Sequence, residues 1–216
     1  MVAMGGPQFT FLLRGLGWTL GLSVMAFVLG IVSGLAVALA RTSGWRPLAR
    51  LAAGYIAVFQ GTPLLMQLFV VYYGLALAGL ALEAWQAVAI GFTLYASAFL
   101  GEIWRGSIDA IPRGQTDAAR ALGLHYVPRM KDVILPQALR ISLPATVGFL
   151  VQLLKGTSLA AIVGFTELTR AGSIIANQIF EPLLVFGIVG GLYFAVCWPL
   201  SLYGARLERR LAVASR

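Results

Sequence analysis

The chain has 216 residues, of which 59% are hydrophobic and 11% are charged, and its 16 basic and 8 acidic side chains give a net charge of +8. A soluble domain is roughly half apolar and roughly a quarter charged, so this composition excludes an ordinary soluble domain. The positive charges stand at the ends of apolar runs, which is typical of membrane proteins and not of a nucleic-acid-binding groove. A single Cys and a single His argue against a disulfide framework and a His/Cys metal site.

The first uncharged run covers residues 15–40 and is 26 residues long. The apolar region of a signal peptide has roughly 7–15 residues, whereas a transmembrane helix needs about 20. We therefore predict a retained transmembrane helix, preceded by a short amino-terminal segment at residues 1–14.

The second uncharged run covers residues 51–82, which is long for one span and short for two. Pro63 disfavours helical geometry at Thr62, so the run should divide there. We predict an interfacial or tilted lead-in at residues 51–60 and the main second span at residues 63–79.

Three further apolar runs, at residues 84–101, 141–163 and 182–205, predict the third, fourth and fifth spans. The expected fold class is an all-α membrane protein with about five transmembrane helices. Its membrane domain should cover residues 15–206, and a basic tail follows at residues 207–216.

Five spans place the two termini on opposite sides of the membrane. Basic residues gather after the first span, within residues 105–140 and after the fifth span, while few stand on the other side. Because cytoplasmic loops carry the excess of Lys and Arg, the amino terminus should be periplasmic and the carboxyl terminus cytoplasmic. The polar segment at residues 105–140 then lies in the cytoplasm.

This polar segment predicts two short helices around a glycine joint. Thr116 can cap the first helix, Asp117 suits its first turn, and Gly123 can end it with a positive φ. The second helix should begin at Pro128 and stop before Pro136. Between the cap and the glycine the surface is small and apolar: Ala118, Ala119, Ala121 and Leu122. Two interpretations stay open, a loop packed on its own membrane domain and a peg that docks into another protein.

The amino-acid sequence of this segment resembles the EAA loop of ABC importer permeases. Its triplet is Asp117-Ala118-Ala119, Gly123 stands four residues after the second Ala, and Ile134-Leu135-Pro136 follows. Three other segments extend the resemblance to the polar amino-acid branch of that family, over residues 15–206: GTPLLMQLFVVYYGL at 61–75, GEIWRGSIDAIPRGQ at 101–115 and KGTSLAAIVGFTELTRAG at 155–172.

The resemblance implies the type I importer permease fold, in a bacterial inner membrane, with an EAA helix that couples to a cytoplasmic ATPase. The coupling residues would be Asp117, Ala118, Ala119 and Gly123, with Asp117 standing where Glu is usual. The implied partners are two copies of a cytoplasmic ABC ATPase, a second permease subunit, a periplasmic substrate-binding protein and the lipid bilayer, with no nucleic acid. ATP and Mg would be bound by the ATPase subunits.

No cofactor and no catalytic residue are expected in this chain. It contains no G-x-x-x-x-G-K-[ST] loop to hold phosphates, so we do not expect it to hydrolyse ATP. No Ser/His/Asp set is present either, because the only His is His125 in the polar segment, where a surface contact is the expected role.

Polar residues inside the apolar runs are the candidates for a substrate pathway: Gln67, Gln152, Lys155, Thr157 and Ser158. A charge within the membrane is a functional hypothesis by default, although Lys155 can also snorkel to the outer surface. The two glutamines can instead join two spans through a hydrogen bond.

Two departures from the family bear on the substrate: Gly156 stands where an acidic or amide residue is usual, and Gln60 where Arg is usual. In the outer connection, Thr166, Glu167 and Arg170 can receive a binding protein or pair locally at the surface.

Three functions remain open. The first is the permease subunit of an ATP-driven importer for a polar amino acid, which forms an alternating-access pathway with a second permease. The second is a permease of the same architecture for a sulfonate, an opine or a betaine. The third is a self-contained secondary transporter, which predicts inverted repeats and relay charges near the midplane. The sequence does not decide the solute, or whether the second permease is another copy or a paralogue.

Overall fold

The structure is a computed structural model that describes residues 5–214, and in that range it contains helices and no strand. Residues 1–4 of the predicted amino-terminal segment and residues 215–216 of the predicted tail lie outside the described residues. In chain order the elements are α1 (Gly6–Thr42), α2 (Arg46–Gly61), α3 (Leu64–Phe69), η1 (Val70–Gly74), α4 (Leu75–Leu77), α5 (Ala84–Asp109), α6 (Arg113–Ala121), α7 (Tyr126–Pro128), η2 (Arg129–Ile134), α8 (Leu135–Gly156), η3 (Thr157–Val163), α9 (Leu168–Ile179) and α10 (Pro182–Ala214).

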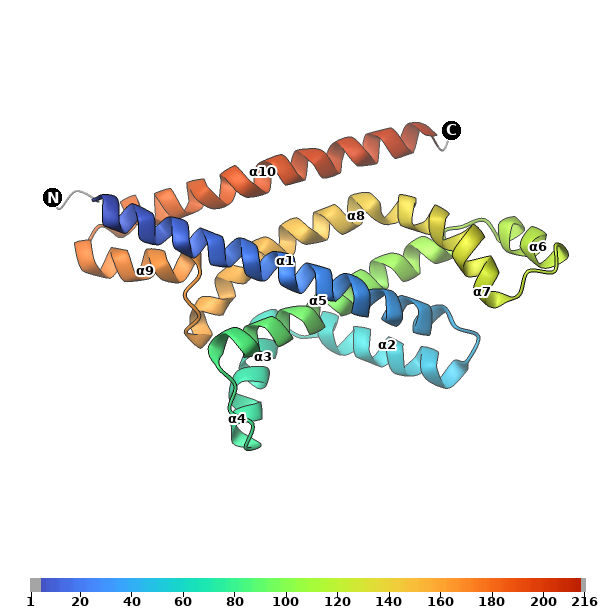
Figure 1. Cartoon of the computed structure of the whole chain (residues 1–216), viewed down its shortest axis with the longest axis horizontal. Coiled ribbons are helices and arrows are strands. Elements are labelled where there is room, and N and C mark those ends of the chain that lie inside the picture. Colours follow the sequence, from blue (N-terminus) through green and yellow to red (C-terminus); the bar gives the residue numbers. More distant parts are fainter. Residues whose placement is uncertain (1–4, 215–216) are drawn as a thin grey trace.

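The bundle is elongated, with α6 at one end and α9 at the other, beside the first turns of α1 (Figure 1). Four helical stretches are long and apolar enough to cross a membrane: α1, α5, the continuous stretch Tyr126–Val163, and Pro182–Leu211 within α10. They confirm the predicted first, third, fourth and fifth spans, and each is longer than predicted.

The second predicted span, at residues 63–79, does not form a helix of membrane-spanning length by itself. The helix Arg46–Gly61 and the segment Leu64–Leu77 meet at an angle of 106° and form a fifth crossing only if the bent pair counts as one span. Pro63 causes the division as expected, because Thr62 before it takes an extended conformation with ψ 143°. The predicted lead-in at 51–60 belongs to the longer helix α2, and α3 and α4 project from the bundle (Figure 1).

Small residues let α1 and α5 pack closely along their length. A Cβ atom at Gly30 of α1 would lie 2.6 Å from the Cβ of Ala96, and one at Gly101 of α5 would lie 2.7 Å from Val37. Close backbone approach of this kind drives helix association where lipid supplies no hydrophobic force. As a result α5 is the central helix, with 61% of its most apolar window buried.

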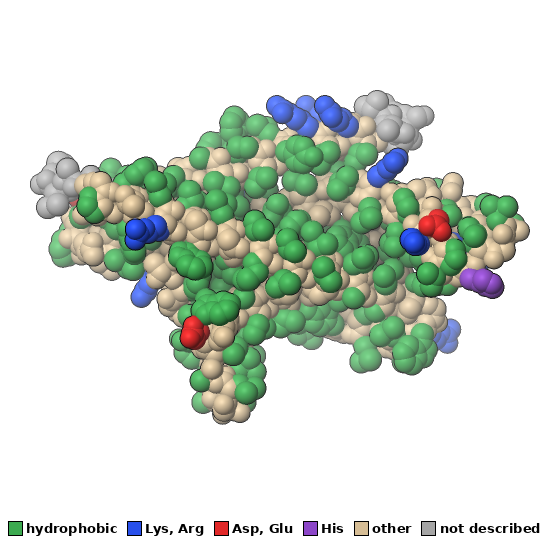
Figure 2. Space-filling view, viewed as in Figure 1, with side chains coloured by type: hydrophobic (Ala, Val, Ile, Leu, Met, Phe, Trp, Pro, Cys, Tyr) green, Lys and Arg blue, Asp and Glu red, His purple; other side chains and the backbone are tan. Residues whose placement is uncertain are grey.

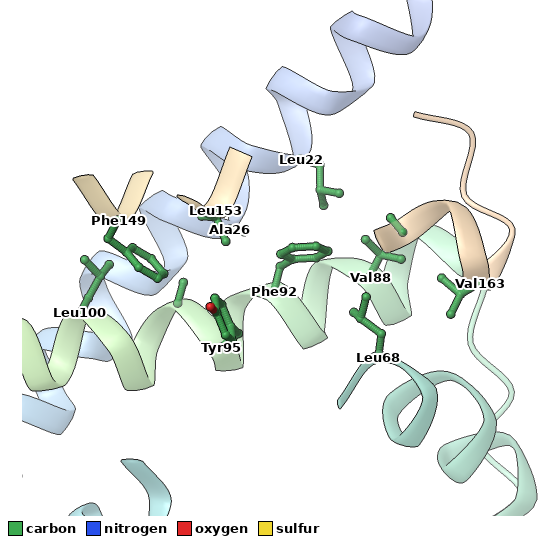
Figure 3. Close-up of a cluster of buried hydrophobic side chains, with 12 residues drawn as sticks. Leu22, Ala26, Leu68, Val88, Phe92, Tyr95, Leu100, Phe149, Leu153 and Val163 are labelled. Carbon is green, nitrogen blue, oxygen red and sulfur yellow. The ribbon is translucent and has the colours of Figure 1, made fainter. Parts of the chain in front are cut away.

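The main apolar core forms where α1, α3, α5, α8 and η3 meet (Figure 3). Phe92 of α5 is fully buried between Leu22 of α1 and Leu68 of α3. Phe149 of α8 stacks against Phe99 with ring centroids 5.6 Å apart. The core therefore joins the amino-terminal and carboxyl-terminal halves of the chain around α5.

Candidate functional site

The polar segment folds into the helix α6, which lies at the far end of the bundle from α9 (Figure 1). The helix begins at Arg113, three residues before the predicted cap Thr116, because Pro112 takes the cap position with φ −55° and ψ 133°. Proline suits the start of a helix because its missing N–H has no partner there. The predicted capping role of Thr116 is therefore wrong, and Asp117 lies in the second turn rather than the first.

Gly123 ends α6 with a left-handed conformation, as predicted, at φ +76°. The N–H of Gly123 donates to the carbonyl of Arg120 at 2.9 Å, and the N–H of Leu124 donates to that of Ala119 at 3.0 Å. These two bonds form a Schellman motif, in which a residue with positive φ lets the chain turn back and satisfy the last carbonyls. The glycine thus fixes the direction in which the chain leaves α6.

The second predicted helix does not stop before Pro136, and this part of the prediction is wrong. The chain continues without a break from Tyr126 to Val163, and the six residues before α8 form the π-helical segment η2. Proline cannot donate the usual backbone hydrogen bond, and the π-helical segment η2 directly before α8 lets the helix continue past Pro136. The connection from α6 therefore leads directly into the longest apolar stretch of the carboxyl-terminal half.

α6 is fixed to the bundle on one side and open on the other. Ala119 is 3% exposed, and beneath the helix Ile111, Met130 and Ile134 form a small apolar cluster. On the open side, Asp117 and Ala118 are exposed. The Asp117 carboxylate lies 3.7 Å from the Arg120 guanidinium, and both side chains are largely in solvent, so this pair contributes little to stability.

The candidate pathway residue Gln67 stabilises the bend between α2 and α3. Its side-chain amide donates to the carbonyl oxygens of Phe59 at 2.8 Å and of Thr62 at 3.0 Å. The side chain is 8% exposed, and its Oε1 has no hydrogen-bond partner in the structure. Gln67 therefore satisfies carbonyls that the end of α2 leaves free, in place of the predicted bond between two spans.

The other four candidates lie on α8 and η3 and face different neighbours. Gln152 is exposed and donates to the hydroxyl of Tyr95 on α5 at 3.0 Å, which is the interhelical bond left open as an alternative. Lys155 is exposed and lines a hollow of about 300 Å³ with residues of α10. The hydroxyls of Thr157 and Ser158 donate to carbonyls three residues back, at 2.6 and 2.8 Å, and Thr157 is fully buried.

The five candidates do not form one hydrogen-bonded site, although α3 and η3, which carry three of them, pack against each other. No hydrogen bond joins Gln67 to residues 155–158 within the described part of the chain. The predicted interruption of the fourth span is present, because α8 ends at Gly156 and continues as the 3₁₀-helix η3. Among the candidates, Gln152 and Lys155 present their polar groups on the surface of the bundle, whereas Thr157 does not.

Glu167 is fully buried at the end of the bundle opposite α6, so the predicted position at the surface is wrong. Its carboxylate caps α9 by accepting the N–H groups of Thr169 and Arg170, each at 2.8 Å. The hydroxyls of Tyr193 on α10 and Thr19 on α1 also donate to it, at 2.9 and 3.4 Å. One carboxylate thus holds three helices together.

Burial raises the pKa of the Glu167 carboxyl, because desolvation penalises the charged form, and the hydrogen bonds from Thr169, Arg170 and the two hydroxyls offset part of this effect. The sequence did carry a signal for the local role. An acidic residue directly before an amphipathic run is a typical helix cap. Its contacts with α1 and α10 depend on tertiary packing, which the sequence pattern does not contain.

A group of paired charged side chains, which was not predicted from the sequence, lies where α5 approaches α6. The guanidinium of Arg105 binds Glu102 through two nitrogens, at 2.6 and 2.8 Å, and Asp109 through a third at 2.5 Å. The three residues follow each other at helical spacing on one face of α5. They pair the charges at the α6 end of the central helix.

Comparison with known proteins defines the class of this protein. Residues 26–213 match the family described as the binding-protein-dependent transport system inner membrane component. The chain belongs to this family. It is a membrane-spanning permease subunit of ABC import systems, a class whose members work with ATPase and substrate-binding partners.

Individual relatives agree with this assignment. The chain is 36% identical over 210 residues to the arginine transport system permease protein ArtQ of Bacillus subtilis (strain 168), covering 95% of this chain and 94% of that protein. It is 35% identical over 198 residues to the L-cystine permease protein TcyB of the same organism, covering 91% and 85%. A crystal structure of an amino acid ABC transporter with histidines superposes with a TM-score of 0.86 at 34% identity, covering 94% of each chain.

Proposed function

We propose that this chain imports a polar amino acid, delivered by a periplasmic binding protein, in a complex with a second permease subunit and two cytoplasmic ATPases. Support for the substrate class comes from the relatives, which are named for arginine and cystine transport. The ATPases bind ATP and Mg in this proposal, and this chain supplies the path and the coupling contact.

The observation that carries the proposal is the construction of α6. Ala119 fixes the helix to the bundle, the Gly123 turn sets its exit, and Asp117 and Ala118 remain in solvent. On either side of Gly123, Leu122 is 80% and Val127 is 68% exposed, so two apolar side chains next to α6 are left uncovered by the bundle. A helix that is fixed to the bundle on one side and has exposed apolar side chains next to it is suited to docking into a cleft of an ATPase subunit.

The proposed orientation places α6 in the cytoplasm of a cell with an inner membrane, the amino terminus in the periplasm and the carboxyl terminus in the cytoplasm. The basic residues at the α6 end support it through the positive-inside rule. This assignment also requires the bent pair of α2 and the following segment to cross the membrane once.

A single-cysteine experiment tests the orientation. In a Cys197→Ser background, Gln178→Cys on α9 should react with a membrane-impermeant thiol reagent added outside, whereas Gln115→Cys on α6 should react only after the membrane is opened. Both glutamines are exposed, so accessibility in the folded protein does not bias the comparison. The reverse pattern would place α6 outside the cell and remove the ATPase contact.

The function itself is tested by uptake into vesicles that contain the reconstituted complex. Polar amino acids, presented with the cognate binding protein, should stimulate ATP hydrolysis and accumulate inside. A nopaline permease of Agrobacterium fabrum (strain C58 / ATCC 33970) is 32% identical over 204 residues, so an opine belongs in the same panel. If only the opine stimulates ATP hydrolysis, the substrate is an opine and not a polar amino acid.

The same assay separates the pathway candidates. Gln152→Leu and Lys155→Met remove exposed polar groups and should lower uptake or change the preferred substrate, because a zwitterion crossing apolar surroundings needs partners for both charges. Thr157→Val is the matched control, since its buried hydroxyl serves its own helix. If all three variants keep the uptake and substrate specificity of the wild type, the substrate path does not run along this face of α8.

A further inference from the structure

Lys155 is the only charged residue in the apolar runs that predict the five spans, which are residues 15–40, 51–82, 84–101, 141–163 and 182–205. Figure 2 shows hydrophobic side chains over the middle of the visible face, whereas Lys and Arg side chains lie toward its two ends and along the carboxyl-terminal part of α10. A cation within a span almost always faces a water-filled cavity or pairs with an opposite charge, because hydrocarbon does not solvate it. Lys155 therefore requires a polar space or an anionic partner.

No acidic side chain among residues 5–214 forms an ion pair with Lys155. All ion pairs in this range lie on α5 and α6. The next acidic residue along the chain is Glu167, whose carboxylate is fully buried and already accepts four hydrogen bonds. An anion that pairs with Lys155 must therefore come from another molecule.

The space beside Lys155 is a hollow of about 300 Å³ between α8 and α10, at the lower end of the range of about 300–1,000 Å³ that is usual for small-molecule sites. Its other lining residues are uncharged: Tyr193, Phe194, Cys197, Trp198 and Ser201. Phe194 and Trp198 stack with ring centroids 5.8 Å apart, so one wall is aromatic. Opposite charges attract more strongly in such low-dielectric surroundings than in water. The hollow therefore has the size and the charge to hold a small carboxylate, with the ammonium group of Lys155 as its partner.

The position of the hollow favours a substrate path over lipid as its surroundings. Both walls belong to stretches long and apolar enough to span the membrane, and only 17% of the most apolar window of α10 is buried within the chain. The open face of α10 is therefore covered either by acyl chains or by the second permease subunit. Acyl chains offer no partner for an ammonium group, whereas a path between two permeases carries an amino acid, which always has a carboxylate.

We infer that Lys155 binds a carboxylate of the transported amino acid in this hollow and selects against a net positive charge on the substrate. The inference rests on the proposed function, because it takes the transported amino acid as the occupant. Lys155 attracts a second carboxylate on the substrate, whereas it repels a second cationic group, for which the apolar runs contain no acidic residue. The substrate is therefore an acidic or neutral amino acid. Arginine, for which one relative is named, should be a poor substrate of this chain.

A reporter thiol in the hollow tests this inference. In a Cys197→Ser background, Ser201→Cys places an exposed thiol on the α10 wall, and the complex with the ATPases is purified in lipid nanodiscs. L-Glutamate, L-glutamine and L-arginine are compared for how far each slows modification of this thiol by a small uncharged reagent. Glutamate and glutamine should protect the thiol at concentrations about tenfold lower than arginine, because the like charge of arginine opposes its binding beside Lys155.

Two replacements of Lys155 and one control isolate the effect of its charge. Lys155→Met should remove the preference for glutamate over arginine, and Lys155→Glu should reverse it. Arg14→Met should keep the wild-type preference, because Arg14 is an exposed cation on α1 that does not line the hollow. A lysine that only snorkels to the outer surface would give equal protection by glutamate and arginine in the wild type, or an unchanged preference in Lys155→Met. Either result would overturn the inference.

Failure of the proposed function gives a different result. If no amino acid stimulates ATP hydrolysis by the reconstituted complex with its cognate binding protein, the proposed function is wrong. If arginine stimulates hydrolysis and protects the reporter thiol as well as glutamate does, the proposed function stands and this inference alone is wrong.

Discussion

A Gly123→Val variant should lose most ATP-driven uptake while its membrane spans still insert and the protein still purifies. At φ +76° a side chain with a Cβ is strained by about 1–2 kcal/mol, and branching at the Cβ adds to this. A penalty of that size lowers the affinity for the ATPase by about tenfold or more if the turn must relax before docking. Co-purification of the ATPase and binding-protein-stimulated hydrolysis are the measurements.

Three further variants isolate the conformational cause. Gly114 and Gly123 both have open space around an added Cβ, but only Gly123 has a positive φ. Gly123→Ala should therefore reduce coupling, whereas Gly114→Ala should not. Gly123→Asn should keep most of the activity, because Asn tolerates the left-handed conformation. Full uptake by Gly123→Val would mean that the turn after α6 has no part in coupling.

Replacing Glu167 by leucine should destabilise the permease by roughly 3–5 kcal/mol, because each buried donor left without an acceptor costs about 1–3 kcal/mol and part of this cost is relieved by relaxation. The leucine leaves the N–H groups of Thr169 and Arg170 and two hydroxyls without their acceptor. Glu167→Gln should cost about 1–3 kcal/mol, because its amide can accept on only one side. Thermal unfolding followed by size-exclusion chromatography measures both, and Glu181→Gln, at the start of α10, provides the control. A thermal midpoint equal to that of the wild type for Glu167→Leu would contradict the role of this carboxylate in joining α1, α9 and α10.

The pH dependence of that network has a defined sign. Because burial raises the pKa of the Glu167 carboxyl, the folded state favours the protonated form. The stability contribution of this group is fully present below the ordinary Glu pKa of about 4.3 and is lost as the pH rises through the raised value. The thermal midpoint of the wild type should therefore rise as the pH falls through that window, and that of Glu167→Gln should not.

Features decided by a few neighbouring residues could be predicted from the sequence. The left-handed turn at Gly123 follows from a glycine behind a short run of helix-forming residues, and the division at Pro63 follows from the steric effect of proline on Thr62. The end of α8 at Gly156 belongs to the same group. Each depends on backbone preferences that act within one helical turn.

Features decided by packing could not be predicted in this way. The 106° angle between α2 and α3 depends on how Gln67 satisfies carbonyls across the bend, and the sequence shows only that the helix is interrupted. Pro136 was expected to stop a helix, but the preceding π-helical turn lets the stretch continue. The burial of Glu167 depends on Thr19, which is 148 residues away in the chain. Among the pathway candidates, Gln152 and Lys155 are exposed and Thr157 is buried. This difference depends on which side of each helix is covered by neighbouring helices.

The continuous stretch Tyr126–Val163 starts beside α6 and ends at the far side of the bundle. Within it, α8 has 22 residues and extends over about 33 Å at 1.5 Å per residue, so a tilt of about 5° at the α6 end displaces the opposite end of α8 by about 3 Å. Such a displacement is comparable to the width of an amino acid side chain. We therefore expect α8 to act as a lever arm, in which a small rotation of the docked helix α6 becomes a movement at the opposite end of the bundle.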